Sequence, residues 1–169
     1  MNMNEKYSAS LPYPPISKCF EKSLSFASSL NASRLGELQT ISEYIYQSIL
    51  LEAQYPEVAK ALEGIAMVEM RHYKILSELM HKLGVDPYLN NRIRTVPMNI
   101  SGKNGKDILC KVKNALLQNI SEENSSKEEY LRLAKSSPCS EIANILERIA
   151  DDEGLHSEIF DTILQKLNF

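Results

Sequence analysis

Two stretches of the chain repeat apolar residues at alternating spacings of four and three. The first stretch contains Val58, Leu62, Ile65, Glu69, His72, Leu76, Leu79 and Leu83. The second contains Ile142, Leu146, Ile149, Glu153, His156, Phe160, Ile163 and Leu167. Positions spaced in this way lie on one face of an α-helix and turn toward the core of a helix bundle. The pattern therefore predicts two amphipathic helices, each with a glutamate and a histidine in the middle of its apolar face.

Helix breakers divide the chain into four long segments. Tyr55 precedes a proline, a glycine follows Leu83, and Ser137, a candidate N-cap, precedes another proline. We expect helices at about 24–54, 57–83, 106–135 and 138–167. The irregular segment 85–105 is long for a connection inside a domain, which indicates a crossover between distant ends. Short, long and short connections predict an all-α fold, an antiparallel four-helix bundle with one long crossover.

The chain begins with a segment of different character. Residues 1–22 contain Pro12, Pro14 and Pro15 beside two tyrosines, a composition that does not sustain a helix. We expect this segment to form an extended arm that contacts a partner subunit, followed by the bundle at 23–169.

Composition and charge exclude several classes of protein. The 169 residues are 43% hydrophobic, enough for one domain with a core, and only six are glycine, which argues against an all-β fold. The formal net charge is -3 without a basic run, so no nucleic-acid partner is expected. No stretch approaches the ~20 apolar residues of a membrane-spanning helix. The start of the chain lacks the order of a signal peptide, so we expect a cytoplasmic protein.

Two further glutamates match the Glu-x-x-His pairs in depth. An unpaired buried carboxylate costs several kcal/mol, so both pairs need compensation. In an antiparallel hairpin, residues at one level lie equally far from the turn. The midpoint between Glu37 and Glu69 falls near the first break, and the midpoint between Glu123 and Glu153 falls at the second. The chain thus resembles two copies of one hairpin, each giving two glutamates and one histidine to a shared level.

The charge of this level indicates how many metal ions it would hold. Four carboxylates carry four negative charges, which two divalent cations neutralise. Mixed carboxylate and imidazole ligands suit iron, manganese or zinc. Tyr44 follows Glu37 by seven residues, and Tyr130 follows Glu123 by the same spacing, so each tyrosine shares a helix face with its glutamate. The sequence predicts a dinuclear metal site with two neighbouring tyrosines.

With these residues, the chain resembles the ferritin-like superfamily, specifically its rubrerythrin and bacterioferritin branch. The segment Gly-Glu-Leu-Gln-Thr-Ile-Ser-Glu-Tyr at 36–44 is similar to the first-helix motif of that branch. Glu-Met-Arg-His at 69–72 and Glu-Gly-Leu-His at 153–156 are similar to its second-helix and fourth-helix motifs. The resemblance covers about residues 30–167 and implies a ferritin-like bundle with two iron ions.

The resemblance also implies a role for each candidate residue. The implied ligands are Glu69 and Glu153 as bridges, Glu37 with His72 on one ion, and Glu123 with His156 on the other. Glu122 is the rival to Glu123, but only Glu123 keeps the seven-residue spacing to Tyr130. Tyr44 and Tyr130 would hydrogen-bond the ligand carboxylates and could donate electrons.

Departures from the family pattern bear on partners and cofactors. Rubrerythrins usually carry a rubredoxin-like domain as electron donor, whereas this sequence has no Cys-x-x-Cys, so an external donor such as a rubredoxin-like protein is expected. Rubrerythrins also carry an extra glutamate where this chain has Ser126, so the ligand set is closer to the ferroxidase centre of bacterioferritin. Met70 stands where that branch has a haem-ligating methionine. Methionine on a bundle helix is ordinarily a packing residue, so haem is not expected.

The expected function is that of a di-iron oxidoreductase that reacts with H2O2 or O2. Its peroxidase or ferroxidase activity would serve oxidative-stress defence or iron handling, and its expected assembly is a homodimer. Two alternatives stay open. One is an iron-storage protein of ferritin type, which would form a very large particle, and the other is a helical interaction module without catalysis.

Overall fold

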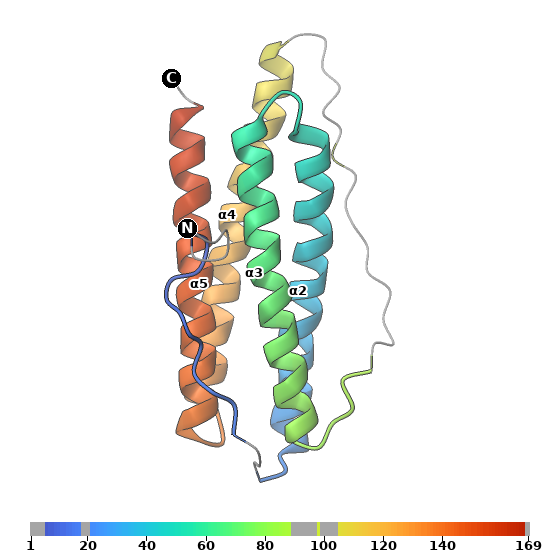
Figure 1. Ribbon diagram of the computed structural model, residues 1–169, viewed down its shortest axis with the longest axis vertical. Helices are drawn as coiled ribbons and strands as arrows, with labels where there is room; N and C mark the ends of the chain where they lie inside the picture. Colours follow the sequence, from blue (N-terminus) through green and yellow to red (C-terminus); the bar gives the residue numbers. More distant parts are fainter. Residues whose placement is uncertain (1–5, 18–20, 89–97, 99–104, 168–169) are drawn as a thin grey trace.

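Four long helices make up most of the molecule (Figure 1). The structure, a computed structural model, describes residues 6–17, 21–88, 98 and 105–167. The helices are α2 (Leu24–Leu51), α3 (Pro56–Lys82), α4 (Gly105–Lys135) and α5 (Ser140–Lys166). Among these described residues, no helix is long and apolar enough to cross a membrane. The prediction of an all-α four-helix bundle is confirmed.

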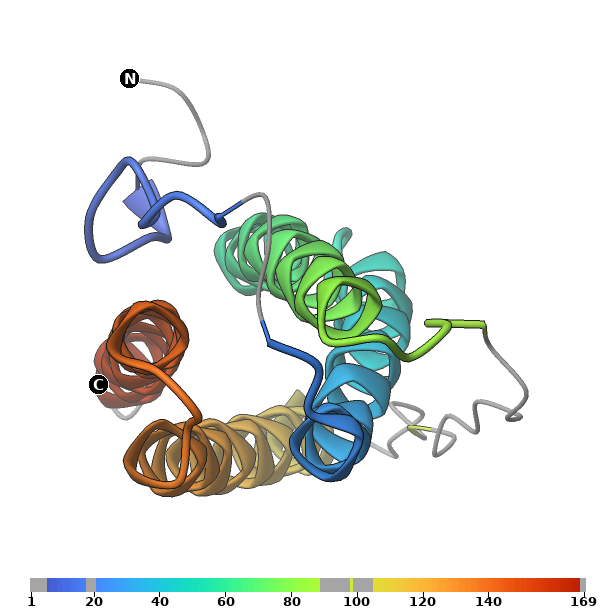
Figure 2. The ribbon, with the colours of Figure 1, turned by 90° about the horizontal axis from the view of Figure 1, so that it is seen from below.

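The helices are arranged as two hairpins. α2 packs along α3 and α4 along α5, and the hairpins meet through α3 with α5 and α2 with α4 (Figure 2). α4 begins at the end of the bundle opposite to the end of α3 (Figure 1), an arrangement that requires a long crossover. Most of the predicted 85–105 connection lies outside the described residues. Within it, the Met98 amide donates a hydrogen bond of 3.2 Å to the Tyr46 hydroxyl on α2.

The helix ends follow local chemistry. α3 begins with Pro56, whose missing N–H would have had no partner in the first turn. It is followed by Gly84 at φ +96°, the left-handed conformation that glycine tolerates best. The prediction that Ser137 caps the last helix is wrong. Its hydroxyl group bonds the backbone of Cys139 in a local turn, so α5 begins only at Ser140.

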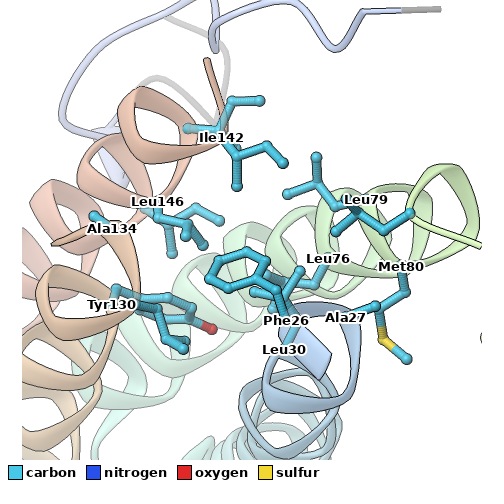
Figure 3. Packing of buried hydrophobic residues seen from close by; sticks show 14 of the residues in the cluster. Phe26, Ala27, Leu30, Leu76, Leu79, Met80, Tyr130, Ala134, Ile142 and Leu146 are labelled. Carbon is cyan, nitrogen blue, oxygen red and sulfur yellow. The ribbon is translucent and has the colours of Figure 1, made fainter. Parts of the chain in front are cut away.

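The apolar core is divided into two clusters. One lies toward the α4–α5 turn and includes Phe26, Leu76, Tyr130 and Leu146 (Figure 3). The other lies toward the α2–α3 turn and includes Tyr44, Leu62, Leu116 and Phe160. Each cluster takes side chains from all four helices. The space between the clusters is occupied by a polar layer.

The described part of the N-terminal arm, residues 6–17, lies on its own bundle. Figure 2 shows it passing along the outer side of the gap between α3 and α5. Tyr7 is only 1% exposed and packs against Gly64 of α3. A Cβ at position 64 would lie 2.2 Å from the Tyr7 ring, so this approach requires glycine. The sequence predicts that the arm contacts a partner subunit, whereas this part of it covers helices of the same chain.

Candidate metal centre

All four helices contribute to the polar layer between the two apolar clusters. Its members are Glu37 from α2, Glu69 and His72 from α3, Glu123 from α4, and Glu153 and His156 from α5. Each side chain is at most 5% exposed. The structure therefore brings together all six residues that the sequence predicts as ligands, and heptad position explains why, since each helix turns this face to the bundle axis.

The layer consists of two overlapping groups of possible ligands. One group is Glu37, Glu69, His72 and Glu153, and the other is Glu69, Glu123, Glu153 and His156. Within each group the ligand atoms lie within 4.8 Å of one another. Glu69 and Glu153 belong to both groups, so these two carboxylates stand where bridges between two ions would stand.

Glu69 lies between the two histidines. Its Oε2 is 2.8 Å from His72 Nδ1, and its Oε1 is 2.8 Å from His156 Nδ1. Glu153 Oε1 lies 3.1 Å from His72 Nδ1, and Glu123 Oε2 lies 3.5 Å from His156 Nδ1. Both imidazole rings therefore turn Nδ1 toward the carboxylates.

Without a metal, protons offset the crowded charges. Burial and the neighbouring Glu69 carboxylate raise the pKa of both Glu37 and Glu153 well above the usual range. Burial alone would lower the pKa of His72 and His156, but the adjacent Glu69 carboxylate and the other acceptors hold both pKa values well above the usual range. Burial likewise would raise the pKa of Glu69, but the two histidines outweigh it and hold that pKa well below the usual range. Protons held by these groups therefore offset negative charge in the layer.

The layer also contains buried atoms without hydrogen-bond partners. Within the described ranges these include Glu69 Oε1, Glu153 Oε1 and His156 Nδ1. Glu69 Oε1 and His156 Nδ1 are close to each other, but their orientation is not that of a hydrogen bond. Unpartnered buried polar atoms are uncommon in folded proteins, and carboxylate oxygens with imidazole nitrogens are ligands for divalent transition metals. The residues present therefore fit a pair of such ions.

The two predicted tyrosines hold the outer carboxylates from across the bundle. The Tyr44 hydroxyl group on α2 donates a hydrogen bond to Glu123 on α4, and the Tyr130 hydroxyl group on α4 donates one to Glu37 on α2. Each tyrosine therefore donates its hydrogen bond to the glutamate of the opposite hairpin and not to the glutamate of its own helix. Burial and the Glu123 carboxylate raise the pKa of Tyr44 well above its ordinary value, which keeps this hydroxyl group protonated as a donor.

Sequence reasoning did not single out Asp152, which lies beside the layer. Asp152 Oδ2 is 3.0 Å from His72 Nε2 and also accepts a hydrogen bond from Tyr13 of the arm. Arg148 Nη1 forms an ion pair with Asp152 Oδ1 at 2.8 Å. Burial would raise the pKa of Asp152, but His72 and Tyr13 outweigh it, so the pKa lies well below the usual range. The only signal in the sequence was the four-residue spacing of Arg148 and Asp152.

Other residues considered from the sequence lie outside the layer. Glu122 is half-buried and accepts a hydrogen bond of 2.6 Å from Gln118, so the third-helix carboxylate of the layer belongs to Glu123. Met70 is 50% exposed and lies outside the layer.

A four-helix bundle whose helices converge on buried glutamates and histidines defines a ferritin-like carboxylate protein. The family model described as Rubrerythrin matches residues 29–164 of this chain. The chain belongs to the rubrerythrin family. This confirms the resemblance to the rubrerythrin and bacterioferritin branch.

A solved structure of Desulfovibrio desulfuricans bacterioferritin shares this fold. The TM-score is 0.67 at 22% sequence identity, and the match covers 99% of this chain and 85% of that chain. That crystal structure is described as showing the diiron site in a cycled state, reduced in solution and allowed to reoxidise. A search of curated proteins finds no significant match.

Proposed function

We propose that this protein is a di-iron oxidoreductase of the peroxidase or ferroxidase type that reacts with H2O2 or O2. The observation that carries the proposal is the pair of four-ligand groups that share Glu69 and Glu153. Two ions that share bridging carboxylates can act together on one small oxidant. Membership of the rubrerythrin family and the likeness to a bacterioferritin with a diiron site support iron over manganese or zinc.

The six residues of the layer would be the ligands of the two ions. Glu37 and His72 would hold one ion, Glu123 and His156 the other, and Glu69 with Glu153 would contact both. Two bound ferrous ions would supply the chemistry of a two-electron donor, by which H2O2 and two protons would give two molecules of water.

The surrounding residues of the chain keep the layer ordered and dry. Tyr44 and Tyr130 fix the outer carboxylates by hydrogen bonds, so Glu123 and Glu37 are already oriented. The apolar clusters on both sides exclude water from the layer, which strengthens the electrostatic interactions inside it. The electrons that restore the ferrous state would come from an external donor, such as a rubredoxin-like protein.

An anaerobic titration of the metal-free protein with Fe(II) tests this proposal. We expect saturation at two irons per chain, followed by a rise in near-ultraviolet absorbance when O2 or H2O2 is added. The oxidant that reacts faster assigns the protein to the peroxidase or the ferroxidase type. Competition with Mn(II) and Zn(II) tests the choice of metal. Absence of saturable binding would contradict the proposal and leave a helical interaction module.

A second candidate function is iron storage, favoured by the structural similarity to bacterioferritin. Storage requires a hollow assembly of many subunits, whereas the enzyme is proposed to act as a homodimer. Size-exclusion chromatography with light scattering separates the two candidates. A dimer favours the enzyme, and a very large particle that takes up many irons per chain favours storage.

A further inference from the structure

The N-terminal arm supplies hydrogen-bond acceptors to both histidines of the layer. His156 Nε2 lies 2.9 Å from the carbonyl oxygen of Tyr7. His72 Nε2 lies 3.2 Å from the hydroxyl group of Tyr13 and 3.0 Å from Asp152 Oδ2. A histidine that binds a metal through one ring nitrogen is oriented by the partner of its other nitrogen. The outer nitrogens of both rings thus contact the arm.

The contact between Tyr7 and His156 determines which ring nitrogen of His156 carries a proton. A carbonyl oxygen can only accept a hydrogen bond, so His156 Nε2 must carry the proton. In the neutral ring Nδ1 then keeps its lone pair, and this atom faces Glu69 and Glu123. The Tyr7 carbonyl therefore selects the form of His156 that binds a metal through Nδ1.

The two hairpins differ in the acceptor that each offers to the histidine of the other. Glu69 and His72 on α3 correspond to Glu153 and His156 on α5, so Val68 occupies the position that corresponds to Asp152. Asp152 gives His72 a carboxylate acceptor from the opposite hairpin. Val68 offers no side-chain acceptor to His156. The backbone carbonyl of Tyr7 fills this gap in the otherwise repeated arrangement.

The arm is anchored at the level of the layer by specific contacts. The Tyr7 ring packs on the bare backbone of Gly64, and the Ala9 amide donates a 2.6 Å hydrogen bond to Asp152 Oδ1. Arg148 Nε donates a 3.0 Å hydrogen bond to the carbonyl oxygen of Ser10. The guanidinium group of Arg148 also lies over the Tyr13 ring, 4.5 Å from its centroid. These contacts join the arm to both α3 and α5.

We propose that residues 7–13 of the arm are positioning residues of the metal centre. The Tyr7 carbonyl holds His156, while Tyr13, together with Asp152, holds His72. This inference rests on the proposed metal-binding function. It adds that metal affinity depends on a segment outside the four helices. That dependence is greater for His156 because, within the part of the chain that the structure describes, its outer nitrogen meets the Tyr7 carbonyl and no acceptor from the opposite hairpin.

The test compares Gly64→Ala with Gly36→Ala in the full chain. A Cβ at position 64 would collide with the Tyr7 ring and displace the arm, whereas a Cβ at position 36 meets nothing within 4 Å. Both glycines lie inside long helices, so the two substitutions change helix propensity alike. Tyr7→Ala, which removes the anchoring ring without adding volume, gives a second way to release the arm if Gly64→Ala folds poorly.

The readouts use diamagnetic zinc(II) as the probe metal. Proton NMR follows hydrogen exchange of the two Nε2–H groups in the zinc-loaded protein, and competition with a chromophoric chelator gives zinc affinity. Release of the arm should accelerate exchange at His156 at least tenfold and leave His72, which keeps Asp152, much less affected. Zinc affinity should fall roughly 10- to 100-fold, the usual effect of losing such a partner. Gly36→Ala should match the unaltered chain in both measurements.

The outcomes separate the two proposals. If the unaltered chain binds no zinc, the metal centre itself is wrong, and the role of the arm is wrong with it. If the unaltered chain binds two zinc ions while Gly64→Ala and Tyr7→Ala keep the same affinity and the same slow exchange at His156, only the role of the arm is overturned. Equal acceleration at both histidines would also overturn it, because that result indicates general loosening of the bundle.

Discussion

Tyr130 on α4 donates a hydrogen bond to Glu37 on α2, so the second hairpin orients a carboxylate of the first. The reciprocal bond from Tyr44 to Glu123 makes this relationship two-fold. These bonds join the hairpins at the layer where the apolar core is interrupted. They therefore contribute to the stability of the bundle as well as to the orientation of the carboxylates.

Replacing Tyr130 by phenylalanine should destabilise the metal-free protein. The substitution keeps the ring but leaves a buried carboxyl oxygen without its donor, at a cost of about 1–3 kcal/mol in the free energy of unfolding. Urea denaturation measures the loss. Tyr88→Phe, at a position 75% exposed, is the control and should change the free energy by less than about 0.5 kcal/mol. Equal stability of the two variants would contradict the bond to Glu37.

Replacing Glu69 by glutamine should remove tight binding of both ions together. Glu69 belongs to both ligand groups, so a neutral amide at this position weakens both. We expect the zinc or iron stoichiometry to fall from two per chain to less than one under conditions that saturate the unaltered protein. Glu63→Gln, an exposed change on the same helix, should retain two. Two tight ions in the Glu69 variant would contradict the assignment of the shared ligand.

The metal-free protein should lose stability as the pH rises above about 4.5, the ordinary pKa of glutamate, and more steeply above about 6.5, the ordinary pKa of histidine. The raised pKa values of His72, His156, Glu37 and Glu153 mean that the folded state binds their protons more tightly than the unfolded chain does. Their stabilising contribution is complete below the unfolded pKa values and is lost as the pH rises through the folded values. The lowered pKa of Glu69 acts in the opposite direction, in the acid range below about pH 4.5.

Thermal unfolding between pH 5.5 and 9, with a chelator and with saturating zinc, measures this effect. Zinc takes the place of the protons, so the zinc-loaded protein should be the more stable form, and its advantage should grow with pH. A metal-free protein whose melting temperature rises over this interval would contradict the protonation of the layer.

Replacing Leu146 by alanine should weaken the fold without altering the metal site. Leu146 is fully buried in the cluster near the α4–α5 turn, and its truncation should cost about 2–5 kcal/mol. Metal stoichiometry should remain two per chain, because the six residues of the layer are unchanged. Leu117→Ala, at a position 53% exposed, should have little effect on stability. A loss no larger than that of Leu117→Ala would contradict this packing.

Periodicity accounts for the part of the site that could be predicted from the sequence. Glu69 and His72 interrupt an apolar heptad stripe, and their counterparts on α5 do the same, so burial of these charges followed from helix geometry. The depth of Glu37 and Glu123 followed from their distance to the turns. A regular helix keeps the same period over about thirty residues, so the face and depth of each position can be counted from the sequence. This is why these six positions converge in the structure.

The contribution of the arm could not be predicted in this way. Residues 6–17 follow no helical or strand period, so nothing in their order indicates which surface they cover. Asp152 lies beside the stripe, and the arm covers it with hydrogen bonds from Ala9 and Tyr13. These contacts with Tyr13 and Ala9 join segments that are far apart in the sequence, so helix periodicity does not reveal them. The same holds for the backbone carbonyl of Tyr7, an acceptor that any residue type provides.

The division of the core has a consequence for the order of assembly. Each apolar cluster contains side chains from all four helices, so each one alone fastens the two hairpins together. The bundle can therefore fold without metal ions, while the histidines and glutamates of the layer hold protons. On the proposed function, metal loading is an exchange of protons for ions within a bundle that is already folded, so folding and loading are separate events.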